Sequence, residues 1–137
     1  MITQPQTELV SCPEAAIYGV DERRPPVLAI LVPCYNEQDS LTTAIDTLRA
    51  LVDEMIKKKL VAADSFLYFV DDGSTDETWR VLWEAHGADK HVKALRLSRN
   101  FGHQNALLAG LMMVKDRCQA VVSIDADMQQ DPDAIAL

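Results

Sequence analysis

The chain has 137 residues, 48% of them hydrophobic, which suits one domain with a single buried core. Its 13 Lys and Arg against 21 Asp and Glu give a formal charge of −8, which argues against a nucleic-acid binder because neutralising phosphates needs clustered basic residues. Cys12, Cys34 and Cys118 lack the spacing of a disulfide framework or a zinc site, and no apolar run reaches the roughly 18 residues of a membrane span, so we expect a soluble chain in a reducing compartment.

The first residues lead into a buried strand and a long helix. Residues 1–26 are polar and aperiodic, which predicts a flexible N-terminal tail before a domain that covers residues 27–137. The continuous apolar run 27–32 predicts a strand buried on both faces, which Pro33 should end. From Ser40, a favourable N-cap, apolar residues recur at helical spacing as far as Ile56. This helix should pack on the sheet.

A second strand and helix follow the same pattern. Residues 66–70 predict another buried strand, and Ser74 with Glu77 forms the sequence of a capping box. The helix that follows carries Trp79, Leu82 and Trp83 on one stripe. Two tryptophans four residues apart could form a stacking platform, but an apolar helical stripe more commonly packs in the core, and we expect that here.

The rest of the chain adds a third strand, a third helix and a fourth strand. These are predicted over residues 92–97, 104–115 and 120–124, respectively. The third helix should turn four residues toward the sheet, namely Leu107, Leu108, Leu111 and Met112. After Asp133, four residues look like the beginning of another helix, so the unit looks truncated. An unpaired sheet edge in such a unit would favour self-association.

The alternating order of strands and helices predicts the fold class. With right-handed crossovers it gives an α/β fold, a Rossmann-like parallel sheet of alternating βα units with helices on both faces. The residues just after the strands then meet at one edge of the sheet. These residues are mostly polar: Pro33, Cys34, Tyr35, Asn36 and Glu37; Asp71, Asp72, Gly73 and Ser74; Arg99 and Asn100; and Asp125 and Asp127.

Asp125 and Asp127 predict a metal site. In an extended chain residues i and i+2 project to the same side, so both carboxylates can face one cation at the end of the fourth strand. Carboxylates favour Mg²⁺ or Mn²⁺, whose remaining ligands are commonly water and substrate phosphates. Asp71 and Asp72 crowd the same edge, and a cation would relieve the repulsion. The chain lacks a Gly-x-Gly-x-x-Gly fingerprint and a P-loop, so the metal is expected to hold a diphosphate.

Four motifs resemble glycosyltransferase family 2. They are Val32-Pro33-Cys34-Tyr35-Asn36-Glu37, Val70-Asp71-Asp72-Gly73-Ser74, Ser98-Arg99-Asn100-Phe101-Gly102-His103 and Asp125-Ala126-Asp127-Met128-Gln129. The third and fourth are similar to the polyprenyl-phosphate branch of that family, which includes dolichyl-phosphate mannose synthase and bacterial undecaprenyl-phosphate sugar transferases. The resemblance covers residues 27 to about 133. It implies the nucleotide-binding half of a GT-A glycosyltransferase fold.

The resemblance also implies roles for individual residues. Asp125 and Asp127 would be the catalytic residues, holding the metal and the donor diphosphate together with Gln129. A second group would bind the donor: Pro33, Tyr35, Asn36, Glu37, Asp71, Asp72 and Arg99, the last by neutralising negative charge. His103 invites assignment as a general base, but a lone histidine at a turn is more commonly structural.

The implied reaction is metal-assisted, inverting transfer of a sugar from a nucleotide-diphosphate sugar to a polyprenyl phosphate. UDP-linked donors are favoured over GDP-mannose, and the full-length enzyme would act at the cytoplasmic face of the membrane. Two alternatives stay open: a nucleotide-sugar-binding module without transferase activity, and a family 2 enzyme with a different acceptor.

Two other α/β folds fit less well. A receiver domain needs its acidic pair after the first strand, and a sugar-nucleotide pyrophosphorylase needs a Gly-rich, Arg-containing loop where Pro33–Glu37 stands.

Overall fold

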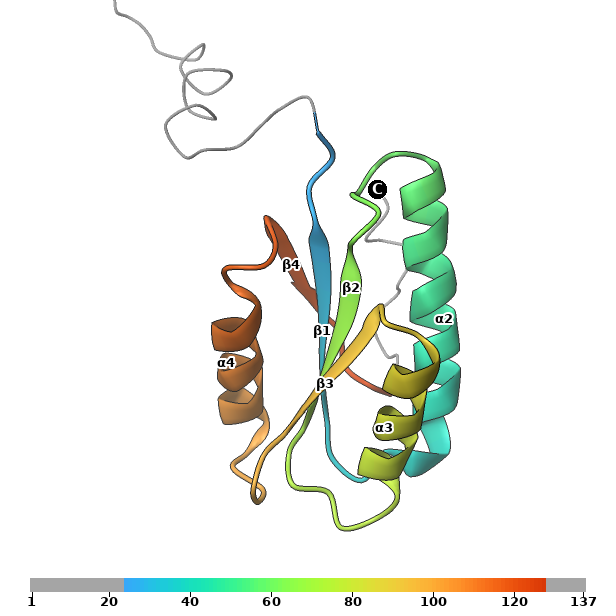
Figure 1. Cartoon of the computed structure of the whole chain (residues 1–137). Coiled ribbons are helices and arrows are strands. Elements are labelled where there is room, and N and C mark those ends of the chain that lie inside the picture. The colour runs from blue at the N-terminus through green and yellow to red at the C-terminus, as the bar shows by residue number, and fades with distance from the viewer. Residues whose placement is uncertain (1–23, 128–137) are drawn as a thin grey trace, which may run out of the picture.

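The computed structural model describes residues 24–127, which form a parallel sheet with helices on both faces (Figure 1). The elements follow one another as β1 (Leu28–Cys34), α2 (Gln38–Lys57), β2 (Phe66–Asp71), α3 (Thr78–Ala88), β3 (Val92–Arg96), α4 (His103–Val114) and β4 (Ala120–Ser123). The strands lie in the order β3-β2-β1-β4, and all three pairings are parallel. The predicted α/β fold with alternating βα units is therefore confirmed.

The two central strands are buried on both faces because helices cover both. All seven residues of β1 and all six of β2 are buried. One core lies between the sheet and the pair α2 and α3, around Ile30, Leu48 and Phe69. The other lies between the sheet and α4, around Leu31, Tyr68 and Val114. Within the described part of the chain, no helix is long and apolar enough to cross a membrane.

Pro33 does not end the first strand as predicted, because β1 continues to Cys34. The pairing of β1 with β4 stops at Leu31, whereas Pro33 and Cys34 still pair with β2. Cys34 O accepts a hydrogen bond from Asp72 N on the β2 side. Since backbone groups alternate along a strand, the N–H that Pro33 lacks would point toward β4, beyond the end of that ladder.

The predicted starts of the first two helices are wrong in detail. Helix α2 begins at Gln38, so Ser40 lies inside its first turn instead of capping it. Helix α3 begins at Thr78, and the predicted capping box does not form because Ser74 Oγ accepts a hydrogen bond from Asn36 N, 2.9 Å away. Asp76 Oδ1 instead accepts the N–H of Thr78. Partners from a distant loop have displaced the local capping pattern.

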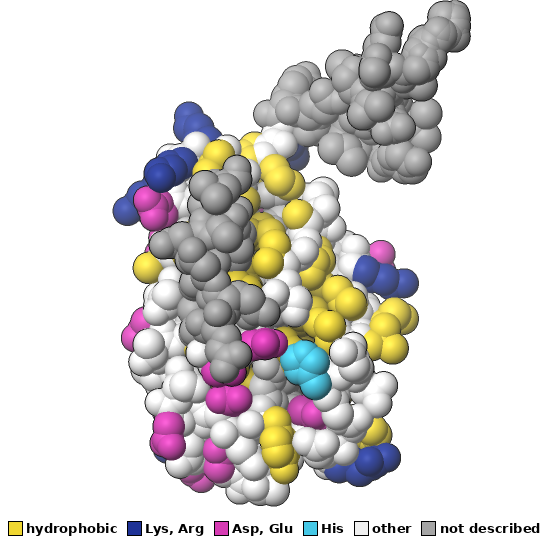
Figure 2. Space-filling model, turned by 180° about the vertical axis from the view of Figure 1, so that it is seen from behind, with side chains coloured by type: hydrophobic (Ala, Val, Ile, Leu, Met, Phe, Trp, Pro, Cys, Tyr) yellow, Lys and Arg dark blue, Asp and Glu magenta, His cyan; other side chains and the backbone are white. Residues whose placement is uncertain are grey.

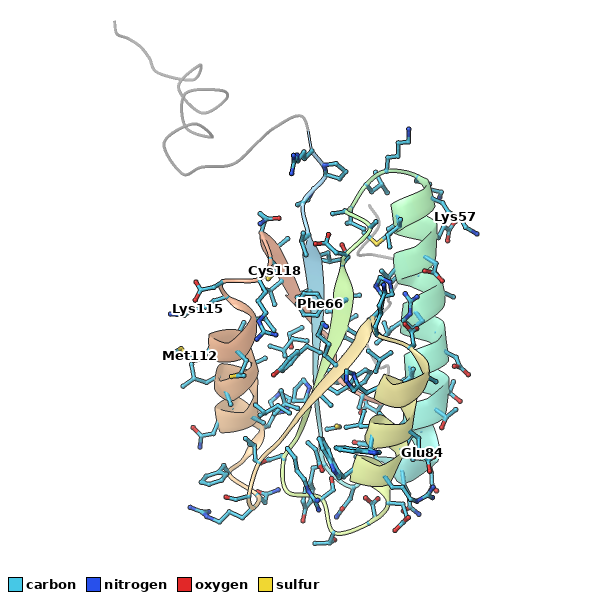
Figure 3. The ribbon with its side chains drawn as sticks, viewed as in Figure 1. Lys57, Phe66, Glu84, Met112, Lys115 and Cys118 are labelled. Atoms are coloured by element: carbon cyan, nitrogen blue, oxygen red, sulfur yellow. The ribbon has the colours of Figure 1, made fainter. Side chains whose placement is uncertain are left out.

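Two predicted apolar faces are corrected in part: Leu82 is buried, and Trp79 and Leu107 pack against the core as predicted, but other members of the two faces do not. Trp83, which was expected in the core, is 68% exposed. Helix α4 packs through small residues, and a Cβ at Gly110 would lie 2.4 Å from Leu31 Cδ1, so this helix approaches the sheet more closely than bulky residues allow. Leu108, Leu111 and Met112 are consequently exposed, and Figure 3 shows Met112 on the side of α4 away from the sheet.

An ion pair joins α2 to the turn before β3. Arg49 Nε lies 2.5 Å from Asp89 Oδ2, and the His91 N–H donates to Asp89 Oδ1. Burial acts to raise the pKa of Asp89, but the hydrogen bonds from Arg49 and His91 outweigh it and hold the pKa below its ordinary value. Because the pKa of Asp89 is lower in the folded state than in the unfolded state, its ionised carboxylate stabilises the fold at neutral pH. That stabilisation is lost as the pH falls through the folded-state pKa.

We therefore expect Asp89→Asn to lower the free energy of unfolding at pH 7 by about 1–2 kcal/mol. The gap between variant and parent should narrow as the pH falls toward 3, because the parent's carboxylate is then protonated. Urea unfolding at several pH values measures this. Asp53→Asn is the control, since Asp53 also pairs with Arg49 but is 53% exposed. Equal effects of the two variants would contradict this explanation.

Candidate functional site

A groove of about 300 Å³ opens at the carboxyl ends of the strands, where the sequence placed the site. Every strand end contributes to its lining, which consists of Pro33, Cys34, Tyr35, Glu37, Asp72, Asn100, Gly102, His103, Ala106, Asp125, Ala126 and Asp127. Figure 2 shows acidic side chains and a histidine gathered in the lower part of the molecule, the end toward which the strands run in Figure 1. The predicted convergence of polar residues is confirmed.

The predicted site residues occupy three kinds of position. Pro33, Tyr35, Glu37, Asp72, Asp125 and Asp127 line the groove. Asn36, Asp71 and Arg99 are not among its lining residues. Gln129, predicted as a metal ligand, lies outside residues 24–127.

Asp72 fastens the loop between β3 and α4 to the end of β2. Its Oδ1 accepts the N–H of Phe101 at 2.7 Å and its Oδ2 accepts the N–H of Gly102 at 3.1 Å. The residue is only 3% exposed. A carboxylate that accepts two backbone N–H groups is held firmly, so Asp72 shapes the groove wall as well as lining it.

Asp71 is fully buried at the end of β2 and does not line the groove. Its Oδ1 accepts the N–H of Ser74, but within the described residues Oδ2 has no hydrogen-bond partner, and Arg96 Nε lies 3.9 Å away. A buried carboxylate oxygen without a hydrogen bond is costly. An N–H donor on a bound molecule would remove that cost if it reached this oxygen.

Asn36 joins the loops after β1 and β2. It has a left-handed backbone conformation, with φ of 51°, which asparagine tolerates better than most residues. Its Oδ1 accepts the N–H groups of Thr75 at 2.9 Å and Asp76 at 3.3 Å, and its own N–H donates to Ser74 Oγ. In this structure Asn36 holds the neighbouring Tyr35 and Glu37 in place at the groove.

Arg99 extends along the outside of its loop. Its guanidinium lies 3.9 Å from the ring centroid of Phe101 and donates to the carbonyl of Asn100. The side chain is exposed. The predicted role of Arg99 in neutralising the donor would need it to turn from this stacked position.

His103 belongs to the groove, although the sequence reasoning treated it as a structural turn residue. It is the first residue of α4, and its Nε2 lies 3.9 Å from Asp125 Oδ1. Gly102 before it has φ of 99° and turns the chain into the helix at the groove. The signal was in the sequence, since His103 follows the third strand just as the acidic residues follow the second and fourth.

Cys34 also lines the groove but is only 4% exposed. Burial, and secondarily the charges of Asp71 and Glu37, raise the pKa of its thiol far above the ordinary range. Its Sγ donates to the carbonyl of Val70. A thiol that stays protonated at neutral pH is a poor nucleophile, so Cys34 has a packing role.

The residues present suit a cation that is completed by its ligand. Asp125 and Asp127 both line the groove at the end of β4. In the described part of the chain, no group of three or more His, Cys, Asp or Glu side chains is arranged to hold a metal by itself. Two carboxylates with the remaining positions left to water and phosphate are the donor set that Mg²⁺ uses. The site therefore fits a magnesium or manganese ion bound together with a diphosphate.

Comparison with known proteins finds glycosyltransferases similar to this chain. A bacterial protein, the uncharacterized glycosyltransferase YkoT of Bacillus subtilis, is 48% identical over 106 residues, which cover 77% of this chain and 32% of YkoT. The undecaprenyl-phosphate 4-deoxy-4-formamido-L-arabinose transferase of Yersinia pestis is 35% identical over 109 residues, covering 79% of this chain and 31% of the relative. The chain thus spans about a third of the length of these relatives.

Solved structures show the same fold. The mannosyltransferase PcManGT of Pyrobaculum calidifontis, in complex with GDP-Man and Mn²⁺, superposes with a TM-score of 0.62 at 21% identity, over 85% of this chain and 32% of that one. Residues 1–349 of S. aureus TarS, in complex with UDP-GlcNAc, superpose with a TM-score of 0.56 at 22% identity. This match covers 74% of this chain and 26% of the TarS chain. The fold is that of GT-A glycosyltransferases. The sequence model of the family described as glycosyl transferase family 2 matches residues 29–137, so the chain belongs to glycosyltransferase family 2.

Proposed function

We propose that the whole protein transfers a sugar from a nucleotide-diphosphate sugar to a polyprenyl phosphate, with inversion at the anomeric carbon. The observation that carries the proposal is the pair Asp125 and Asp127 in a groove that all four strand ends line. The relative from Yersinia pestis, whose name specifies undecaprenyl phosphate, supports the choice of acceptor. The reaction would take place at the cytoplasmic face of a membrane, with residues 27–137 as the donor-binding part and residues 1–26 as a tail.

Five of the predicted site residues have a stated part in the proposal. Asp125 and Asp127, with Gln129, would hold Mg²⁺ or Mn²⁺, which when bound would stabilise the charge of the leaving diphosphate. Tyr35, 43% exposed, offers a ring on which the base stacks, and Asp71 Oδ2 offers an acceptor for a ring N–H. The acceptor phosphate is already anionic at neutral pH, so we assign no general base.

A binding module without transferase activity remains the second candidate function. It rests on the same groove, whose lining residues the proposal assigns to the donor alone. Both candidates predict donor binding, and only the first predicts transfer by the full-length protein.

The nucleotide is expected to be UDP. A pyrimidine suits a groove of about 300 Å³ better than a purine, and uracil offers one ring N–H without the exocyclic amino group of guanine, which matches the single acceptor Asp71 Oδ2. Competition against a fluorescent UDP analogue with Mn²⁺ present measures this, and UDP should displace it at a lower concentration than GDP. If GDP displaced the analogue at a lower concentration than UDP, the base would instead be assigned as guanine.

The 137-residue chain alone is expected to bind donor without glycosylating lipid phosphate at a useful rate. Holding two reactants in attack geometry contributes about 7–11 kcal/mol, and in this proposal the groove residues contact the donor only. The assay combines the chain, UDP-glucose, Mn²⁺ and undecaprenyl phosphate in detergent, and mass spectrometry follows the lipid-linked sugar. Rapid turnover would contradict the division between donor and acceptor parts.

A further inference from the structure

Strand β3 forms an edge of the sheet, and part of its backbone points outward. Leu67 N donates to His91 O, and Leu97 N donates to Asp71 O, so the odd-numbered residues of this segment face β2. Because backbone groups alternate along a strand, Val92, Ala94 and Arg96 face away from the sheet.

The first of the three outward positions is already filled. Val92 N donates to Asp89 O at 3.0 Å, and His86 Nδ1 lies 2.6 Å from Val92 O. Within residues 24–127, no group hydrogen-bonds to the outward backbone N–H or C=O of Ala94 or Arg96. The open part of the edge is therefore Ala94–Arg96.

A groove of about 400 Å³ lies at the start of this open part, where Lys93 and Ala94 line it, and it has different chemistry on the two faces of the sheet. On the α3 face lie Trp79 and Trp83, with ring centroids 6.3 Å apart, and Trp83 is 68% exposed. The opposite face supplies Lys93, whose Nζ lies 5.7 Å from the Phe66 ring centroid, together with Tyr68 and Arg117. No Asp or Glu of the described residues lines this groove, although the chain as a whole carries a formal charge of −8. Arg96 lies in an adjoining groove together with Asp76, Glu77 and Glu84.

We propose that the β3 edge binds an extended peptide of a partner protein, with alternating apolar and acidic side chains, as an added strand. Side chains of an added strand alternate between the two sheet faces, so the apolar ones would meet Trp79 and Trp83 while the acidic ones meet Lys93 and Arg117. The main-chain groups of Ala94 and Arg96 supply the pairing.

The charges around the β3 edge favour an acidic peptide over a second copy of the chain and over a nucleic acid or an anionic membrane. A second copy pairing antiparallel through its own β3 would place Lys93 and Arg96 of both copies in one two-stranded ladder, with no Asp or Glu on either strand to offset these like charges. A nucleic acid or an anionic membrane would be repelled by the net charge of −8, whereas a short acidic peptide meets mainly the local cations. Lysine on a short edge strand also protects it from unselective pairing, which leaves the edge specific for acidic partners.

Fluorescence anisotropy with the whole chain tests the proposal, using a fluorescein-labelled Glu-Leu-Glu-Leu-Glu peptide and a Lys-Leu-Lys-Leu-Lys control. We expect the acidic peptide to bind and the basic one not to bind. Arg117→Glu should weaken binding at least tenfold, and Trp83→Ala, at an exposed site, should weaken it similarly. Lys115→Glu is the matched control, because Lys115 is exposed, lies outside the groove (Figure 3) and changes the charge equally. It should alter affinity less than twofold.

Two further arms address the mode of binding. One peptide is N-methylated at both leucines and another at the glutamates. Their affinities for the chain should differ, because only one of these two sets of amides faces β3 in an added strand. UDP with Mn²⁺ should not compete, which separates this site from the donor groove. The proposal is overturned if the acidic peptide does not bind, if Arg117→Glu and Lys115→Glu weaken it equally, or if both N-methylated peptides bind as well as the parent.

Discussion

Replacing Asp127 with asparagine is expected to remove the metal-dependent part of donor binding while leaving the fold unchanged. Asp127 is exposed at the groove, so the substitution disturbs little packing. Asparagine keeps the shape of the side chain but removes the charge that a hard cation requires. In calorimetric titrations with UDP and Mn²⁺, the affinity should fall by about tenfold or more, to the value measured in chelator.

The control for this experiment is Asp116→Asn. Asp116 is also an exposed carboxylate, near the end of α4 and outside the groove lining, so it changes the net charge equally. Its affinity for UDP should match the parent with and without Mn²⁺. If parent protein binds UDP equally well in Mn²⁺ and in chelator, the two carboxylates do not hold a metal in the way proposed.

Gly73→Ala is expected to be the most damaging small substitution near the groove. Gly73 has φ of 70°, a region where a Cβ is strained, and the added Cβ would lie 2.2 Å from Arg99 C and 2.4 Å from Asn100 N. Those are backbone atoms of the neighbouring loop, which Asp72 fastens through Phe101 and Gly102. The two loops would have to separate, so both stability and donor affinity should fall.

We expect Gly73→Ala to lower the free energy of unfolding by about 2–4 kcal/mol, from backbone strain and overpacking together. Urea denaturation measures the loss. Gly87→Ala is the matched control, because Gly87 lies in α3 and a Cβ there meets nothing within 4 Å. It should be neutral or stabilising by up to about 1 kcal/mol. Equal stability of the two variants would contradict the tight contact between the loops.

The sequence predicted the framework well because strand burial and helical periodicity are local signals. The continuous apolar run at residues 66–70 identified β2, which ends one residue later at Asp71, and helix α4 begins one residue before its predicted start. The position of the groove followed from the parallel topology alone, since the carboxyl ends of parallel strands share one edge.

The errors arose where a distant partner decides the outcome. Ser74 reads as a helix cap, but Asn36, 38 residues earlier, occupies its hydroxyl. The inward face of α4 was predicted from its bulkiest residues, whereas Gly110 allows a close approach that turns Leu108 outward. Trp83 shares a stripe with Leu82, yet α3 covers the edge of the sheet, so this tryptophan extends beyond the core. None of these relations is visible in a local sequence pattern.

The donor site at the carboxyl edge is tested most directly by crystals of the chain soaked with UDP and Mn²⁺ and measured at the manganese absorption edge. We expect an anomalous peak beside the carboxylates of Asp125 and Asp127, with the diphosphate next to it and the base near Tyr35 and Asp71. A nucleotide bound elsewhere, or one bound in this groove with no manganese at those carboxylates, would contradict this expectation.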